Sequence, residues 1–224
     1  MEASRIPRRT DMSLSDIVTY LQSDLKQSIL DDVQPCLQVG KPRGGYFAVP
    51  RLVLSYVDYL GALYHGYAGE RDRSRRRVFA KSAYAKAFLR DIFGRVDSHY
   101  AKHGDLLWEI YRNGTIHLYE PMALENQAAK IEWQVYKHPD RTVILPVPIG
   151  GGAVKNMPVT HLVPMPVLPN EWIQPISTVC LYEDLLAAID VYTNAIQTDS
   201  AAECRFRETV NKLLQPERTS LNWP

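Results

Sequence analysis

The sequence has few cysteines and no long hydrophobic run, and these absences exclude several classes of protein. Its three cysteines, Cys36, Cys180 and Cys204, lie far apart, which argues against a disulfide framework and against a cysteine-based zinc site. No apolar run approaches the roughly 20 residues that span a bilayer. Residues 1–12 carry charges without the apolar stretch of a secretory signal. We therefore expect a cytoplasmic protein that does not bind a membrane.

A large net charge is also missing. The 224 residues include 26 Lys and Arg and 25 Asp and Glu, which gives a net charge of +1. Such a chain has no overall field that would draw it onto nucleic acid, so any such contact must come from a local basic patch. We expect no DNA partner and no cofactor. The length suits one domain with a substantial core.

Hydrophobic residues recur at helical spacing through the first half of the chain. Ser13 is placed to cap the first helix, with Asp16 near its positive end, and Pro35 is expected to end it. Residues 1–12 are expected to form a flexible basic arm. The predicted helices span residues 13–33, 46–64, 78–93 and 105–118.

Glycines and histidines mark the chain between the third and fourth helices. Gly94 is expected to end the third helix, and Gly104 to separate a short helix or turn from the fourth. His99 and His103 lie four residues apart, a spacing that suits metal ligands on a helix, and Asp105 is close by. A metal site needs a third or fourth ligand with fixed support, which the sequence does not supply, so we expect no metal. A metal hydrolase built on these three residues is the third hypothesis for the function.

The chain changes character after Pro121. The predicted strands span residues 131–135, 142–147 and 159–167, and the predicted helices after them span 181–196 and about 201–214. Prolines are expected to confine the strands to sheet edges or short pieces, with a loop at residues 150–152. The predicted fold class is mainly α. A helical bundle covers residues 13–120, and residues 121–224 form a small antiparallel β appendage and two C-terminal helices packed on the same domain.

Two loops are rich in basic residues or glycine. Residues 38–45, QVGKPRGG, match neither a P-loop nor a dinucleotide fingerprint, so we interpret them as a connector. The dense basic run of the chain holds five arginines: Arg71, Arg73, Arg75, Arg76 and Arg77. Such a run is either a solvated surface or a sequence-independent contact to a phosphate backbone. Both interpretations stay open.

The stretch Asp105–Pro121, DLLWEIYRNGTIHLYEP, combines an apolar helical run with a compact polar cluster. Arg112, Asn113 and His117 in this cluster suit phosphodiester chemistry. An imidazole with a pKa near neutrality can act as general base or general acid, and a guanidinium can hold a phosphate. An amide can orient either group. RNA supplies its own 2′-OH nucleophile, so its cleavage needs no metal.

The spacing of the cluster restricts how its residues could work together. Arg112 and His117 are five residues apart, so on a straight helix they point roughly 140° away from each other. They converge only if the helix breaks, as it could at Gly114, or if a second subunit completes the site. Alternatively, both residues pair with acidic neighbours such as Glu109 or Glu120 at a helix end.

The hexapeptide RNGTIH, Arg112–His117, resembles the R-x4-6-H motif of the HEPN superfamily, the higher eukaryote and prokaryote nucleotide-binding domains. A polar residue often follows the arginine in that family, and Asn113 matches it. The family fold is an α-helical bundle, to which the helices predicted over residues 13–120 are similar. The resemblance implies a metal-independent endoribonuclease in which Arg112 and His117 are catalytic and Asn113 supports them. It also implies a homodimer whose motifs face one cleft.

Two main classes of function therefore stay open. One is RNA cleavage by a HEPN-like dimer, in a toxin–antitoxin or phage-defence setting, with the arginines of residues 71–77 in contact with the RNA. The other is a non-catalytic helical protein that binds nucleotide, RNA or another protein, in which the cluster only completes a helix end. The sequence does not decide whether the chain is an enzyme.

Overall fold

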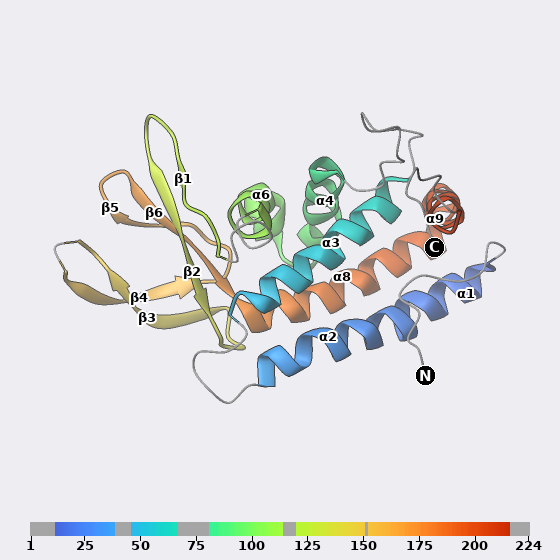
Figure 1. Cartoon of the computed structure of the whole chain (residues 1–224), viewed down its shortest axis with the longest axis horizontal. Coiled ribbons are helices and arrows are strands. Elements are labelled where there is room, and N and C mark those ends of the chain that lie inside the picture. The colour runs from blue at the N-terminus through green and yellow to red at the C-terminus, as the bar shows by residue number, and fades with distance from the viewer. Residues whose placement is uncertain (1–11, 39–45, 67–80, 114–119, 151, 216–224) are drawn as a thin grey trace, which may run out of the picture.

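The computed structural model describes residues 12–38, 46–66, 81–113, 120–150 and 152–215. Long helices run along the molecule, and the strands gather at one end of it (Figure 1). These strands form a four-stranded mixed sheet and a second, two-stranded sheet. The protein is therefore α/β, and the prediction of a mainly α bundle with a small antiparallel appendage is wrong. The predicted basic arm and the predicted connector lie almost wholly outside the described residues.

The first long helix continues through a proline. It comprises α1 (Leu14–Thr19), the π-helical segment η1 (Tyr20–Leu25) and α2 (Lys26–Gln38). The predicted cap is confirmed, because the Ser13 hydroxyl accepts from the Asp16 N–H and the Asp16 carboxylate accepts from the Ser13 N–H. Pro35 lies inside α2, so the prediction that it ends the helix is wrong. A proline in a helix removes one backbone hydrogen bond. Cys36 and Leu37, which follow it, still pack against the main core.

The second long helix, α3 (Ala48–His65), lies at the centre of the main core. Its apolar side chains are buried on nearly all sides, as its sequence predicts, and Pro50 lies in its first turn. Gly61 allows α4 (Ser82–Phe88) to approach closely. A Cβ atom at this glycine would lie 2.8 Å from the backbone nitrogen of Ala85.

Two predicted helix breaks do not occur, because both glycines serve close packing. The helix α4 continues through η2 (Leu89–Phe93) into α5 (Gly94–Val96), and α6 (Ser98–Leu107) continues into η3 (Trp108–Asn113). A Cβ atom at Gly94 would lie 3.1 Å from Ala101 Cβ, and one at Gly104 would lie 3.1 Å from Leu89 Cβ. The break falls at Asp97 instead, whose carboxylate caps α6 by accepting a backbone N–H of its first turn.

The four-stranded sheet has the strand order β1-β2-β6-β5. Its strands are β1 (Leu124–Glu125), β2 (Lys130–Tyr136), β5 (Met165–Leu168) and β6 (Glu171–Ser177). The inner strands β2 and β6 are parallel, and both outer strands are antiparallel to their neighbours. The second sheet pairs β3 (Thr142–Pro148) with β4 (Val154–Thr160). The strands predicted at 131–135 and 142–147 are confirmed, whereas the run predicted at 159–167 is divided between β4 and β5.

The two sheets enclose a second, smaller core. Tyr136, Val147, Val159 and Ile173 are buried in it. The strands β3, β4 and β5, which contain prolines, lie at sheet edges, as predicted. Strand β6, which the sequence did not predict, is an inner strand that contains Pro175. The pairing of β5 with β6 begins at Ile173 and does not reach Pro175, so the missing N–H removes no bond to β5.

The C-terminal helices and the β region complete the main core. Strand β6 leads directly into α8 (Thr178–Thr198), and α9 (Ser200–Leu213) follows, close to the predicted bounds. Helix α8 packs against α2 and α3, and α9 packs against α3 and α8. Figure 1 shows α2, α3 and α8 running side by side. Leu162 and Ile176 from the β region are buried in the same core, so the strands are not an appendage.

Candidate functional site

The central polar cluster begins at a buried helix end. Trp108 and Tyr111 on η3 are fully buried, and Arg112 follows them. The Tyr111 hydroxyl donates to the backbone oxygen of Gln134 at 3.2 Å and to that of Gln174. Burial raises the pKa of the Tyr111 hydroxyl well above its ordinary value, so it remains a donor. These contacts fix η3 against both inner strands of the sheet.

Arg112 is held from two sides. Its Nη2 donates to Asp58 Oδ2 on α3 at 2.9 Å, and its guanidinium carbon lies 5.3 Å from the centroid of the Trp108 ring. The Arg112 side chain is 24% exposed, and the Asp58 side chain is 17% exposed. Its Nε is buried and has no hydrogen-bond partner among the described residues. The sequence suggested Glu109 as a partner of Arg112. Glu109 instead accepts from Lys86 at 2.6 Å, and the carboxylate that pairs with Arg112 is that of Asp58.

The described part of η3 reaches Asn113, and Met122 lies beside this helix. The Met122 N–H donates to the Ile110 carbonyl at 3.0 Å, so the two ends of this stretch lie side by side. Residues 114–119, which include the predicted catalytic His117, lie outside the described residues, as does the side chain of Asn113. Of the three predicted catalytic side chains, the structure therefore places that of Arg112, two residues after Ile110.

The predicted RNA contact at Arg71, Arg73, Arg75, Arg76 and Arg77 lies outside the described residues. The helices that flank it are described. The His65 ring at the end of α3 stacks on the Tyr84 ring at the start of α4, with centroids 3.7 Å apart. This contact holds the two flanking helix ends together.

The histidine pair on α6 does not gather a third ligand. His99 Nδ1 lies 2.8 Å from Asp97 Oδ1, and the rings of His99 and His103 are stacked with centroids 6.4 Å apart. Burial, then the charges of His99 and Lys102, lower the pKa of His103. Within the described ranges, no group of three or more His, Cys, Asp or Glu side chains could hold a metal ion. Asp105 thus adds no ligand to the pair, and the metal hydrolase hypothesis gains no support.

A buried polar cluster joins α6, the sheets and α8, and the sequence analysis did not find it. The Tyr100 hydroxyl donates to Asp184 Oδ2 at 2.8 Å, and Arg141 pairs with the same carboxylate. The Ser177 N–H donates to His161 Nδ1 at 2.9 Å, which places the proton of a neutral ring on Nε2, 3.5 Å from Asp184 Oδ2. The signals in the sequence are a histidine between apolar residues, at His161, and an aspartate on the apolar face of a predicted helix, at Asp184.

Burial determines the protonation of this cluster. It lowers the pKa of His161, whose side chain is fully buried, so the ring is neutral near pH 7. Burial also raises the pKa of Asp184, but hydrogen bonds from His161 and Arg141 outweigh it, and the net pKa lies below the ordinary value. Because solvent does not reach His161, we interpret the cluster as a structural joint rather than a catalytic site.

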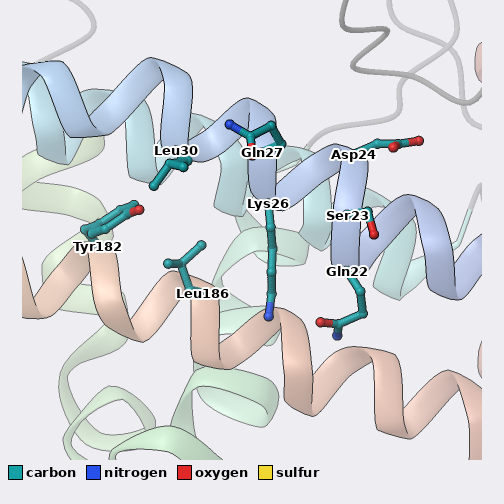
Figure 2. Close-up of a pocket in the computed structure, with 8 residues that line it drawn as sticks. All are labelled: Gln22, Ser23, Asp24, Lys26, Gln27, Leu30, Tyr182 and Leu186. Carbon is teal, nitrogen blue, oxygen red and sulfur yellow. The ribbon is translucent and has the colours of Figure 1, made fainter.

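A groove of about 480 Å³ lies between the first long helix and α8 (Figure 2). Lys26 extends from α2 toward α8 in this view and pairs with Asp190 at 2.5 Å. Gln22 likewise donates to Thr193 at 2.9 Å. The apolar part of the groove is formed by Leu30, Tyr182 and Leu186. Because Lys26 and Gln22 already bind across the groove, we assign it a role in joining the helices and no ligand.

The π-helical winding of η3 does not by itself mark a site, because η1 and η2 have it too. The fold and the central polar cluster together define an α/β protein in which the partly exposed Arg112 is held by Asp58 and Trp108.

Comparisons with family models, with curated proteins and with solved structures found no match to this chain. Among the described helices, none combines the length and apolar character needed to cross a membrane.

Proposed function

We propose that this chain is a metal-independent endoribonuclease of the HEPN type that acts as a homodimer, in a toxin or phage-defence setting. His117 would act as general base and general acid, and Arg112 would hold the phosphate with Asn113 in support. The 2′-OH of the RNA would attack the neighbouring phosphorus, so the reaction needs no metal.

The observation that carries this proposal is the way Arg112 is held. The Asp58 carboxylate and the Trp108 ring orient its guanidinium, and part of the side chain reaches solvent. A guanidinium has five N–H donors, and Asp58 engages one of its two terminal nitrogens. Nε is buried, but the donors of the second terminal nitrogen of this pre-oriented group can meet a phosphate without further ordering.

The position of Met122 also supports the proposal. Its N–H donates to the Ile110 carbonyl at 3.0 Å, so Met122 lies beside the turn of η3 that leads to Arg112. His117 is five residues from Arg112 and five from Met122 in the sequence. Because both of these residues are held at the same helix, the length of the chain keeps His117 near Arg112.

The test is cleavage of single-stranded RNA in the presence of a chelator. Wild type should cleave, and Arg112→Ala and His117→Ala should each lose at least about a hundredfold in rate, in line with the loss of a general acid or a charge-stabilising group. The matched control is Arg90→Ala, which removes an exposed arginine on η2 that pairs with Asp91. Circular dichroism checks that each variant is folded, and sedimentation measures whether the protein is a dimer. Equal cleavage by wild type and both variants, or none by any, overturns the proposal.

A second candidate is a non-catalytic nucleotide-, RNA- or protein-binding protein in which Arg112 is structural. The specific observation in its favour is the same ion pair, because Asp58 already satisfies part of the guanidinium and Nε is buried. On this hypothesis, Arg112→Ala lowers the midpoint of thermal unfolding and the wild-type protein leaves RNA intact. Cleavage of RNA by the wild type in chelator contradicts it.

A further inference from the structure

A second groove, of about 300 Å³, lies between α6 and the tip of the four-stranded sheet. Leu106 of α6 forms one wall, and Leu124, Ile131 and Trp172 from three strands form the other. Trp172 is 38% exposed, although tryptophan side chains are usually well buried. The volume is at the lower end of the range for small-molecule sites. The groove thus presents a large aromatic ring in a space of ligand size.

The register of the strands shows which side chains face the groove. Leu124 pairs with Ile131, and Ile131 pairs with Trp172, so these three side chains form a row on the face toward α6. Glu125 and Lys130 of the neighbouring row, which pair across the strands, also line the groove. The row beside the indole is therefore apolar, and the two charged residues that border it are opposite in sign.

The turn between β1 and β2 adds one polar group. Asn126 lines the groove, and its Oδ1 accepts from the N–H groups of Ala128 and Ala129 at 2.8 and 2.9 Å. The turn therefore fixes the amide, and its NH₂ group has no partner among the described residues. A flat apolar wall, an aromatic face and an amide donor match a nucleobase, which has two flat faces and acceptor atoms on its edge.

The groove is also close to the predicted cleavage cluster along the chain. Leu124 follows Met122 by two residues, which span at most about 7 Å. The Met122 N–H is hydrogen-bonded to the Ile110 carbonyl, and Arg112 follows Ile110 by two residues of the same helix. A short stretch of single-stranded RNA with a phosphate at Arg112 has the length to bring a neighbouring base to the groove.

We propose that this groove binds one unpaired base of the RNA substrate, stacked on Trp172 and hydrogen-bonded by the Asn126 amide. The inference rests on the proposed ribonuclease function and adds a substrate class to it: single-stranded RNA, read through a base beside the scissile phosphate. The apolar row suits a base, and the acidic Glu125 beside Lys130 leaves no excess positive charge in the groove for a phosphate, so we assign phosphate binding to Arg112.

The test is binding of short single-stranded homopolymer RNAs, measured by fluorescence anisotropy in the His117→Ala background, so that the RNA stays intact. Trp172→Ala should weaken binding about tenfold or more, as expected for the loss of one stacked base. Trp172→Phe keeps a ring and should retain most of the affinity. Ile144→Ala, which shortens another exposed apolar side chain on β3, should bind as the background does. Thermal melting checks that the Trp172 variants are folded.

Parallel cleavage assays with wild type and with the single variant Trp172→Ala separate this inference from the proposed function. If RNA is bound through Trp172 and the wild type does not cleave, the groove stands as an RNA-binding site and the catalytic proposal falls. If the wild type cleaves and Trp172→Ala neither weakens binding nor slows cleavage, the groove proposal is overturned and the ribonuclease stands. Absence of RNA binding in the His117→Ala background also overturns the groove proposal, and wild-type cleavage then decides the function separately.

Discussion

Asp58 and Arg112 form an ion pair that connects the middle of α3 to the end of η3, with 2.9 Å between Oδ2 and Nη2. Both side chains are less than one quarter exposed, so water screens this pair less than it screens a surface pair. The pair has two consequences: it orients the guanidinium of the proposed site, and it stabilises the packing of two helices that are far apart in sequence.

We predict that Asp58→Asn lowers the free energy of unfolding by about 1–2 kcal/mol, because Arg112 keeps a hydrogen-bond acceptor and loses its counter-charge. Urea denaturation measures the change. Glu132→Gln is the control, since its carboxylate is 53% exposed and pairs with Lys130 on the surface, where about 0–1 kcal/mol is expected. An Asp58→Asn variant as stable as wild type contradicts the prediction.

Tyr111→Phe should lower the free energy of unfolding by about 1–2 kcal/mol. The substitution removes the hydroxyl that donates to the buried backbone oxygens of Gln134 and Gln174, and it leaves these acceptors without that donor. Tyr182→Phe is the matched control, because no hydrogen bond of the Tyr182 hydroxyl exists in the described part of the chain. Equal losses in the two variants, measured by urea denaturation, are the result that counts against this prediction.

Stability should fall as the pH drops below about 6.5, the ordinary pKa of histidine. Burial lowers the pKa of His161, so the unfolded chain takes up the proton at a higher pH than the folded chain does. The contribution is fully present above pH 6.5 and is lost toward the lowered pKa, with a slope of at most about 1.4 kcal/mol per pH unit. Asp184, whose pKa is also lowered, contributes above about pH 4 and loses its contribution only at more acidic pH.

Urea denaturation between pH 8 and pH 5 measures this dependence, and NMR titration of the His161 ring measures the pKa itself. Burial also lowers the pKa of the more exposed His103, so His103→Gln shows how much of the slope belongs to that residue. A His161 resonance that titrates at or above pH 6.5 disproves the assignment.

Gly61→Ala should destabilise the protein by about 1–3 kcal/mol. The added methyl group would lie 2.8 Å from the backbone nitrogen of Ala85 and 2.9 Å from its Cα, so α3 and α4 must move apart. Ser55→Ala on the exposed side of the same helix is the control and should change stability little. Thermal unfolding of both variants checks this, and an unchanged midpoint for Gly61→Ala argues against the close approach of the helices.

Sequence periodicity predicted the long helices well, because their apolar spacing reports burial directly. It placed breaks at Gly94 and Gly104 that do not exist, since both glycines allow helices to pack closely. It also missed β6. A proline argues against an inner strand, but the pairing of β6 with β5 does not reach Pro175, so the proline is tolerated there. The parallel pairing of β2 with β6 depends on packing between segments that are far apart in the sequence. A local sequence pattern cannot predict which distant strand will be the partner.

The candidate site was predictable in part. The motif gave Arg112, whereas its partner Asp58 lies 54 positions away in the chain. A signal for this partner existed, since Asp58 is a carboxylate inside the most apolar helix of the sequence. The buried His161 and Asp184 gave a similar signal. A charged residue inside an apolar run indicates that a partner exists, but only the fold identifies which distant residue it is.

The direct passage from β6 into α8 has a consequence for how the chain is made. Helix α8 packs against α2 and α3, so the part of the α3 surface that α8 and α9 cover remains exposed until the last quarter of the chain has left the ribosome. We expect a fragment of residues 1–120 to show no cooperative unfolding transition by circular dichroism, and such a transition in the fragment would contradict this. A truncated product would thus carry the RNGTIH motif without a stable fold, so that only complete synthesis yields a protein able to present it.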